Sequence, residues 1–234
     1  MEKKLRIVAV VQARIGSTRL PNKVAMKIRN KSLLEHLIMR LKRSKLVDDI
    51  IIATSTKKRD DKVVQIAKKI GTKFFRGSET DVLGRFTKAA AMLKPDVVVR
   101  VCGDQPLTDP EIVDLAIRKH LKSRADYSST MRKRTFPAGV DAEVFSYKLL
   151  KKIERLAKTP HEREHVTPYI YEHPKKFKIQ NISAGKPLRH PDIKLTVDTK
   201  EDFEFIKRII NGLSGKKRFF TTKDVIDFVK NHSL

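Results

Sequence analysis

Short apolar runs of strand length alternate with helix-like segments along the first half of this 234-residue chain. The runs lie at 5–12, 50–54, 73–76 and 97–101, and a segment with helical spacing of apolar residues follows each of them. Such alternation predicts an α/β fold whose mainly parallel sheet is covered by helices on both faces. Ligands bind such sheets beyond the carboxyl ends of the strands, so the loops after the strands are the segments to search for function.

Capping residues and glycines predict where the helices begin and end. Ser32 and Glu35 have the spacing of a capping box, ahead of leucines and an isoleucine at helical intervals. Gly71 is placed to end a helix, and Asp109 with Pro110 is typical of a helix start. The first helix is expected to begin at residue 33 and the last at residue 221. Between them, helices are expected over 60–70, 78–93, 109–122, 147–157, 160–172 and 200–211. Further strands are expected at 139–145, 178–182 and 193–197.

Composition bounds the class of protein. Lys and Arg number 52 against 27 Asp and Glu, and the net charge of +25 favours anionic partners such as nucleotides, nucleic acid, phosphorylated sugars or membrane surfaces. A lysine-rich surface from a heat-adapted source is the alternative explanation. Cys102 is the only cysteine, which excludes an intrachain disulfide and a cysteine zinc cluster and predicts a reducing, cytoplasmic location. No apolar run approaches the roughly 18 residues of a membrane span.

The length fits a single domain over 1–234, with an appended segment near 126–190 where the alternation of strands and helices changes. The most unusual stretch lies at the other end of the chain, around the loop 12–23. Between Glu2 and Glu35 there is no carboxylate, whereas the interval holds nine Lys and Arg residues. A buried strand that leads into such a loop predicts a site for a multivalent anion, and a triphosphate is our working interpretation. A solvated basic loop is the alternative.

The residues of this loop suit phosphate binding. Gly16 permits a tight turn and close approach of the backbone to a ligand, and Ser17 can donate a hydrogen bond. The cations able to surround phosphate groups are Arg14, Arg19 and Lys23. The sequence is neither a P-loop nor a dinucleotide fingerprint, because G-x-x-x-x-G-K-[ST] and G-x-G-x-x-G are both absent.

Two carboxylates follow later strands of the predicted sheet. Asp104 comes directly after the run 97–101, and Asp198 follows the run 193–197. Carboxylates that face a triphosphate at the ends of strands are typical ligands of Mg²⁺, which uses one or two of them together with phosphate oxygens and water. An ordinary turn at Asp104 and a helix cap at Asp198, with Thr199 as a competing cap, are the alternatives.

Together these segments resemble the sugar-acid cytidylyltransferases. The similarity is greatest to the spore coat polysaccharide biosynthesis protein F group, which is similar to the 3-deoxy-manno-octulosonate and acylneuraminate cytidylyltransferases. It is carried by Q-A-R-x-G-S-T-R-L-P-x-K at 12–23, G-D-x-P-L-x-D-P at 103–110 and V-D-T at 197–199, with further stretches at 76–79, 81–85, 136–145 and 162–169. It covers about residues 6 to 207.

The resemblance implies a nucleotide-diphosphosugar transferase fold, a Rossmann-like three-layer α/β/α arrangement. It implies transfer of CMP from CTP to a sugar acid or related sugar for surface polysaccharide, with release of pyrophosphate and with Mg²⁺ as the cofactor. A homodimer through 126–190 is expected on the same ground. The implied nucleotide-binding residues are Gln12, Ala13, Arg14, Gly16, Ser17, Arg19, Lys23 and Ser78. The implied catalytic residues are Arg14, Lys23 and Asp104, the metal ligands Asp104 and Asp198, and the acceptor residues Gln105, Asp141 and Glu143.

Three other functions were weighed against this one. A nucleotidyltransferase for another nucleoside triphosphate and a sugar phosphate would open with paired glycines, where this chain has Gln12, Ala13 and Arg14. A nucleic-acid-binding protein is compatible with the charge, but no recognised binding motif lies beside the basic runs, so we do not expect it. The stretch 161–165 satisfies the zinc-protease pattern H-E-x-x-H, but Pro160 and Pro168 are wrong for a stable zinc-binding helix.

Overall fold

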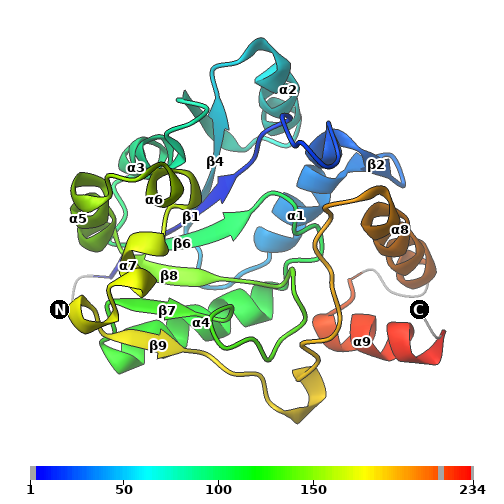
Figure 1. Cartoon of the computed structure of the whole chain (residues 1–234). Coiled ribbons are helices and arrows are strands. Elements are labelled where there is room, and N and C mark those ends of the chain that lie inside the picture. Colours follow the sequence, from blue (N-terminus) through cyan, green and yellow to red (C-terminus); the bar gives the residue numbers. More distant parts are fainter. Residues whose placement is uncertain (1–3, 216–218, 233–234) are drawn as a thin grey trace.

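One seven-stranded sheet in the order β5-β4-β1-β6-β8-β7-β9 forms the centre of the protein, which we describe from a computed structural model covering residues 4–215 and 219–232 (Figure 1). The strands β5, β4, β1 and β6 are parallel, β8 is antiparallel to both β6 and β7, and β9 is parallel to β7. Their bounds are β1 Ile7–Gln12, β4 Asp49–Ser55, β5 Lys73–Gly77, β6 Val97–Cys102, β7 Tyr127–Ser129, β8 Glu143–Ser146 and β9 Ile179–Asn181. The mainly parallel sheet is therefore confirmed.

Helices cover both faces of this sheet. The bounds are α1 Leu33–Leu41, α2 Asp61–Lys69, α3 Val82–Ala91, α4 Pro110–Ser123, α5 Tyr147–Leu156, α6 Pro160–His165, α7 Pro168–Glu172, α8 Lys200–Ser214 and α9 Thr222–Asn231. Short 3-10 turns occupy Lys23–Ala25, Lys58–Asp60, Pro174–Lys176 and Lys186–Leu188, and β2 Lys27–Ile28 pairs with β3 Lys31–Ser32 in a small hairpin.

The side chains of β1 show how the two layers arise. Val8 and Val10 belong to one apolar cluster, with buried residues of α3 and α5. Ala9 and Val11 point to the other face and belong to the cluster that holds α1, α4, α8 and α9. Because successive side chains of a strand point to opposite faces, this all-apolar strand is buried on both sides, as a central parallel strand requires. The three-layer α/β/α expectation is confirmed.

Several predicted elements differ in extent. The run 193–197 forms only an isolated bridge between Lys194 and Ala138, and the run 139–145 contributes a strand only at its end, as β8. The helix expected over 160–172 is two helices, because Val166 has φ of 72° and Pro168 starts the second one. Strand β7, too short for its pattern to be recognised, was missed.

The segment 126–190 supplies the far edge of the sheet. Strands β8, β7 and β9 extend it beyond β6, while α5, α6 and α7 pack beside the parallel half (Figure 1). This places α6 close to α3, and thus near the ends of the parallel strands. Within the described residues no helix is long and apolar enough to cross a bilayer.

Candidate active site

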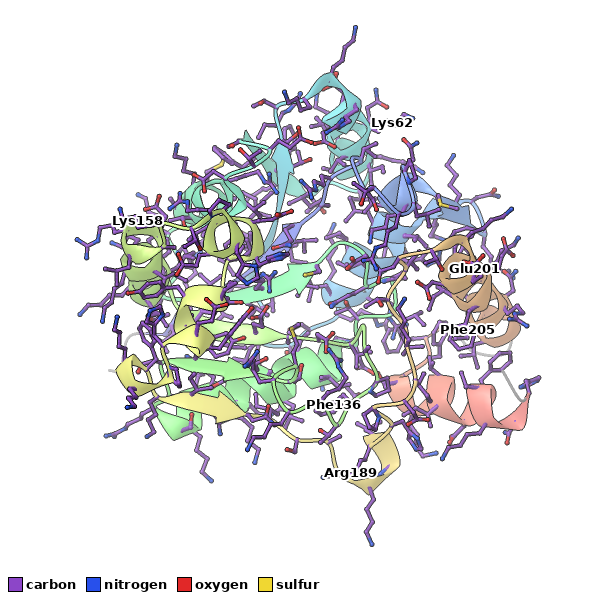
Figure 2. The ribbon with its side chains drawn as sticks, viewed as in Figure 1. Lys62, Phe136, Lys158, Arg189, Glu201 and Phe205 are labelled. Carbon is purple, nitrogen blue, oxygen red and sulfur yellow. The ribbon has the colours of Figure 1, made fainter. Side chains whose placement is uncertain are left out.

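A pocket of about 290 Å³ lies beyond the carboxyl ends of β1 and β6. Its lining comes from the loop after β1, the turn after β6, the beginning of α3, the end of α6 and the residue Asp198. Two of these parts of the lining come from opposite sides of the molecule. Helix α6 lies on the side where Figure 2 labels Lys158, and the segment before α8 lies on the side where it labels Glu201. The site thus lies where ligands bind open α/β sheets.

The loop after β1 is held by a buried carboxylate that the sequence analysis missed. Asp60, fully buried, accepts a hydrogen bond of 2.6 Å from the backbone nitrogen of Ile15 and another from the hydroxyl of Ser55. A Cβ on Gly16 would lie 2.8 Å from the Arg59 guanidinium. A side chain at position 16 would displace the flexible end of Arg59, while the hydrogen bond from Ile15 to Asp60 anchors the loop.

The turn after β6 lies directly against that loop. The backbone nitrogen of Gly103 donates to the carbonyl of Gln12 at 2.8 Å, and a Cβ on Gly103 would approach that oxygen and the Ala13 side chain to 2.9 Å. Only glycine allows the two loops to come this close. The close approach brings Asp104 next to the cations of the first loop.

Lys23 lies between the two predicted metal ligands. Its buried ammonium is 2.9 Å from a carboxylate oxygen of Asp104 and 3.1 Å from one of Asp198, and it also donates to the carbonyl of Val197 at 2.8 Å. Arg19 reaches the same oxygen of Asp198 at 2.9 Å. Cations of the first loop and carboxylates of two distant segments therefore form one cluster at the floor of the pocket.

The cluster sets the charge of Asp198. Partial burial of this carboxyl group opposes ionisation, but the charges of Lys23, Arg19 and Lys194 prevail and hold its pKa below the ordinary value. A carboxylate with a lowered pKa contributes stability above its unfolded-state pKa and loses that contribution as the pH falls through the folded value. Asp198 is accordingly ionised at neutral pH, as a ligand of a cation must be.

The donor set fits a hard divalent cation. Asp104 and Asp198 both reach one ammonium group, so they face a common point, and oxygen is the ligand that Mg²⁺ prefers. No cluster of three or more potential metal-ligating side chains is found in the described part of the chain. A cation held here would therefore take the remainder of its coordination shell from phosphate oxygens and water.

Most of the predicted nucleotide-binding residues line the pocket, namely Gln12, Ala13, Arg14, Ser17, Arg19 and Lys23. Gly16 packs against Arg59 instead. Ser78 lies outside the lining, where its hydroxyl accepts from the backbone nitrogen of Asp81. Cys102 lines the pocket, and burial raises the pKa of its thiol to about 12, which favours the protonated thiol at neutral pH.

The predicted acceptor residues form two separate groups outside the lining. Gln105 donates to Asp141 at 3.3 Å, and Asp141 also binds Arg134 at 2.8 Å. The carbonyl oxygen of the buried Gln105 side chain has no hydrogen-bond partner. Burial raises the pKa of Asp141, although Arg134 opposes the shift.

Glu143 belongs to a buried network of its own. Its carboxylate pairs with Arg100 and accepts hydrogen bonds from the hydroxyls of Tyr127 and Thr167. Arg100 also donates from Nε to the side-chain oxygen of Gln12 at 3.0 Å. The carboxylate of Glu143 is thus occupied by three donors, and through Arg100 it fixes the orientation of a pocket residue.

The predicted site residues did not include those that α6 and α3 contribute to the pocket, although the stretches 81–85 and 162–169 carried part of the family resemblance. His165 and Glu164 line it, and Glu164 pairs with Arg14 across the opening at 3.3 Å. Burial lowers the pKa of His165. Arg163 ties α6 to α3 through two hydrogen bonds to Asp81, of 2.8 and 2.6 Å. The charged stretch 162–165 was the available signal, but its partners are remote in the sequence.

The zinc-protease pattern has no support in this geometry. Glu162, which would be the general base, is the third residue of a capping box and accepts from the backbone nitrogens of Lys158 and Thr159. His161 instead lies 3.2 Å from Glu172. The motif therefore describes a capped, six-residue helix, not a metal centre.

Comparison with known proteins settles the family. The family model described as "Cytidylyltransferase" matches residues 8–226, which is nearly the whole chain. The chain belongs to the cytidylyltransferase family. A solved cytidylyltransferase from Leptospira borgpetersenii serovar Hardjo-bovis superposes with a TM-score of 0.92 at 35% identity, over 98% of this chain and 95% of that one.

Two curated relatives show which cytidylyltransferases the chain is similar to. The spore coat polysaccharide biosynthesis protein SpsF of Bacillus subtilis is 40% identical over 208 residues, covering 87% of this chain and 85% of the relative. The 3-deoxy-manno-octulosonate cytidylyltransferase of Pelobacter propionicus is 33% identical over 132 residues, covering 56% of this chain and 50% of that enzyme. The resemblance stated from the motifs, the implied fold and the assignment as a nucleotidyltransferase are confirmed.

Proposed function

We propose that this cytidylyltransferase moves CMP from CTP to the hydroxyl of a sugar acid or related sugar, in an Mg²⁺-dependent reaction that serves surface polysaccharide synthesis. The observation that carries the proposal is the cluster in which Lys23 and Arg19 meet Asp104 and Asp198 beneath a cationic loop. It combines groups that bind a triphosphate with groups that hold its cation. The names of the SpsF and 3-deoxy-manno-octulosonate relatives support the substrate class.

The chemistry is a single displacement at phosphorus. The sugar hydroxyl oxygen forms a bond to the α-phosphorus of CTP, the bond from that phosphorus to the bridging oxygen breaks, and pyrophosphate leaves while the hydroxyl proton passes to solvent. Mg²⁺, when bound by Asp104 and Asp198, would neutralise phosphate charge and polarise the α-phosphate. Such transfer depends on alignment and charge stabilisation, and no covalent intermediate with the protein is needed.

The cations of the first loop supply most of that stabilisation. Arg14 and Arg19 are placed to bind phosphate oxygens with their forked donors, and Lys23 is a point charge at the floor of the same pocket. In this structure Lys23 neutralises Asp104 and Asp198, and its flexible side chain can turn toward phosphate oxygens. Charge that develops on the leaving pyrophosphate would then meet donors already in position.

The acceptor would be bound by Gln105 and Asp141, whose side chains touch each other beyond Asp104. The unpartnered side-chain oxygen of Gln105 supports this role, since a buried acceptor of this kind suits a sugar hydroxyl. Glu143 would act indirectly: it binds Arg100, and Arg100 in turn holds the side chain of Gln12 in the pocket. Assembly as a homodimer and a cytoplasmic location stay predictions of the sequence.

Pyrophosphate release tests the proposal. CTP, UTP, ATP and GTP are each offered with Mg²⁺ and a panel of sugar acids and sugar phosphates. We expect release with CTP and a sugar acid, and loss of at least about 100-fold in Asp104→Asn, in the range seen when one group that stabilises transition-state charge is removed. The variant must keep the far-ultraviolet circular dichroism of the wild type. Release with another triphosphate and a sugar phosphate would replace this function, and no release from folded protein with any pair would refute it.

A further inference from the structure

Arg85 is a buried cation that no role proposed so far uses. Its side chain is only 3% exposed, although it lines the pocket beside Val82, at the beginning of α3. A Cβ on Gly77 would lie 3.0 Å from the Cγ of Arg85, so the glycine at the end of β5 leaves room for this side chain. The guanidinium is therefore held where it is by close packing.

The hydrogen bonds of Arg85 use only one of its three side-chain nitrogens. One terminal nitrogen, Nη1, donates to the carbonyls of Ser78 at 2.5 Å and Glu79 at 3.3 Å. Nε is buried without a partner, and Nη2 makes no hydrogen bond within the described residues. No ion pair of Arg85 is present in that part of the chain either. Burial lowers the pKa of Arg85 and the nearby charge of Arg14 lowers it further, while the carboxylates of Asp60, Asp81 and Glu79 oppose the shift.

An arrangement like this calls for a ligand. Buried donors in native proteins nearly always have partners, and a buried charge without an ion pair is costly. If Arg85 served only to hold the carbonyls of Ser78 and Glu79, one nitrogen would be enough. Arg85 lines the pocket, so a molecule bound there can supply the acceptors that Nε and Nη2 lack within the described residues.

The sheet order separates Arg85 from the cluster that would bind the triphosphate's cation. Asp104 follows β6 on one side of β1, whereas Arg85 lies over the opposite side, against the loop after β5. Arg14 and the rest of the cationic loop come between them, at the end of β1 itself. A nucleotide with its phosphates at the loop and its cation at Asp104 would extend its base toward Arg85, where Val82 offers an apolar wall.

We infer that Arg85 reads the base of the nucleotide and is a specificity-determining residue for cytosine; the inference rests on the proposed use of CTP. Cytosine presents two adjacent acceptors, O2 and N3, which the forked donors of one guanidinium match. Uracil carries a hydrogen on N3, so its N3–H donor would face an N–H donor of the guanidinium, and no hydrogen bond would form there. A site built to hydrogen-bond one base rejects an analogue that leaves its buried donors unpaired.

The test separates the base from the phosphates by titration calorimetry without turnover. Cytidine, uridine, pyrophosphate, CTP and UTP are titrated into the wild type, Arg85→Met, Arg85→Lys and the control Lys88→Met, which removes an exposed cation from the same helix. We expect at least tenfold weaker cytidine and CTP binding in both Arg85 variants, a smaller preference for CTP over UTP, unchanged pyrophosphate binding, and no change in the control. Arg85→Lys keeps the charge but lacks the paired donors of the guanidinium, so it shows whether base binding needs those paired donors or the charge alone.

The contrary outcomes are distinct. Weaker pyrophosphate binding with unchanged cytidine binding would make Arg85 a phosphate ligand, and unchanged binding of every probe would make it a structural residue; either result overturns the inference. Absence of CTP binding by the wild type would instead refute the proposed function. Because a variant can fail to fold, the Nε–H nuclear magnetic resonance signal of Arg85 is followed in the wild type: it should shift with cytidine and not with pyrophosphate, and the reverse would contradict the assignment.

Discussion

At the scale of single residues, the central feature is that Lys23 occupies the point between Asp104 and Asp198. A lone pair of facing carboxylates would repel, and the ammonium removes that repulsion while no other cation is bound. The same ammonium therefore competes with a divalent ion for the two carboxylates. Lys23 would thus link the binding of the cation to the binding of the phosphates.

This competition predicts the behaviour of Lys23→Met. Without the ammonium, the two carboxylates should bind Mg²⁺ in the absence of nucleotide at least tenfold more tightly, which is about 1.4 kcal/mol. Calorimetric titration of Mg²⁺ into the folded apoprotein measures it, with Lys27→Met, the loss of an exposed cation on β2, as the control. Equal affinity in wild type and variant would show that the ammonium does not occupy the cation site.

The buried pair of Arg100 and Glu143 carries the second prediction at this scale. Glu143→Gln should lower the free energy of unfolding by about 3–5 kcal/mol, because it leaves a fully buried guanidinium without its counter-charge. Urea unfolding measures the loss. The control Glu204→Gln, which breaks the exposed pair with Lys207, should cost less than about 1 kcal/mol. Similar losses in the two variants would mean that burial of the pair does not matter.

Predictions made from the sequence agree best with the structure where the residues that carry the signal are close together in the chain. The capping box at Ser32, the helix start at Thr221, the cationic loop and the carboxylates after strands could be predicted because their signals lie within a few residues. Asp60 and Arg85 could not, because what makes each of them important is a contact with another loop that only the fold creates. The acceptor role expected for Glu143 stays a prediction, and its pairing with Arg100 could not be foreseen because the two residues are 43 positions apart.

At the scale of elements, the strands and helices of the parallel half were predictable because continuous apolar runs alternate there with segments of helical periodicity. In the antiparallel half, β9 lies within the run predicted at 178–182 and β8 overlaps the run predicted at 139–145, whereas the three-residue strand β7 was not predicted, because so short a strand shows no periodicity. The segment 193–197 has the pattern of a strand but forms only one bridge, between Lys194 and Ala138, outside the seven strands of the sheet. That segment lies against the turn after β6, where Val197 donates to the carbonyl of Asp104, and it thereby brings Asp198 to the pocket, with Leu195 packed against the loop at Gly139.

Gly139 tests how closely those two segments must pack. It has φ of +100°, and a Cβ there would lie 2.5 Å from the carbonyl carbon of Leu195. Gly139→Ala should therefore cost about 1 kcal/mol for the left-handed backbone and about 1–3 kcal/mol more for overpacking. Gly71→Ala, with φ of +59° and nothing within 4 Å of the new Cβ, should show the backbone cost alone. If thermal unfolding showed the same loss of stability for Gly139→Ala and Gly71→Ala, the Gly139 loop would be able to move away from Leu195 without an energetic cost.

At the scale of the whole molecule, one sheet brings together residues from five distant segments of the chain. The loop after β1, the turn after β6, the beginning of α3, α6 and Asp198 all reach one pocket of about 290 Å³. The charge of +25 is a separate property: it attracts anionic substrates from a distance, an effect that salt weakens. The fold explains where the reaction would take place, and the charge explains how its substrates would be drawn there.

The central claim is transfer of CMP to a sugar hydroxyl, and ³¹P nuclear magnetic resonance of one reaction mixture tests it most directly. With CTP, Mg²⁺ and a suitable sugar acid, the account predicts that the three signals of CTP are replaced by pyrophosphate and one new phosphodiester signal in equal amounts. The mixture with Asp104→Asn should keep the signals of CTP. Conversion of CTP to CMP and pyrophosphate without a phosphodiester would show hydrolysis, and unchanged CTP with every sugar acid tried would contradict the account.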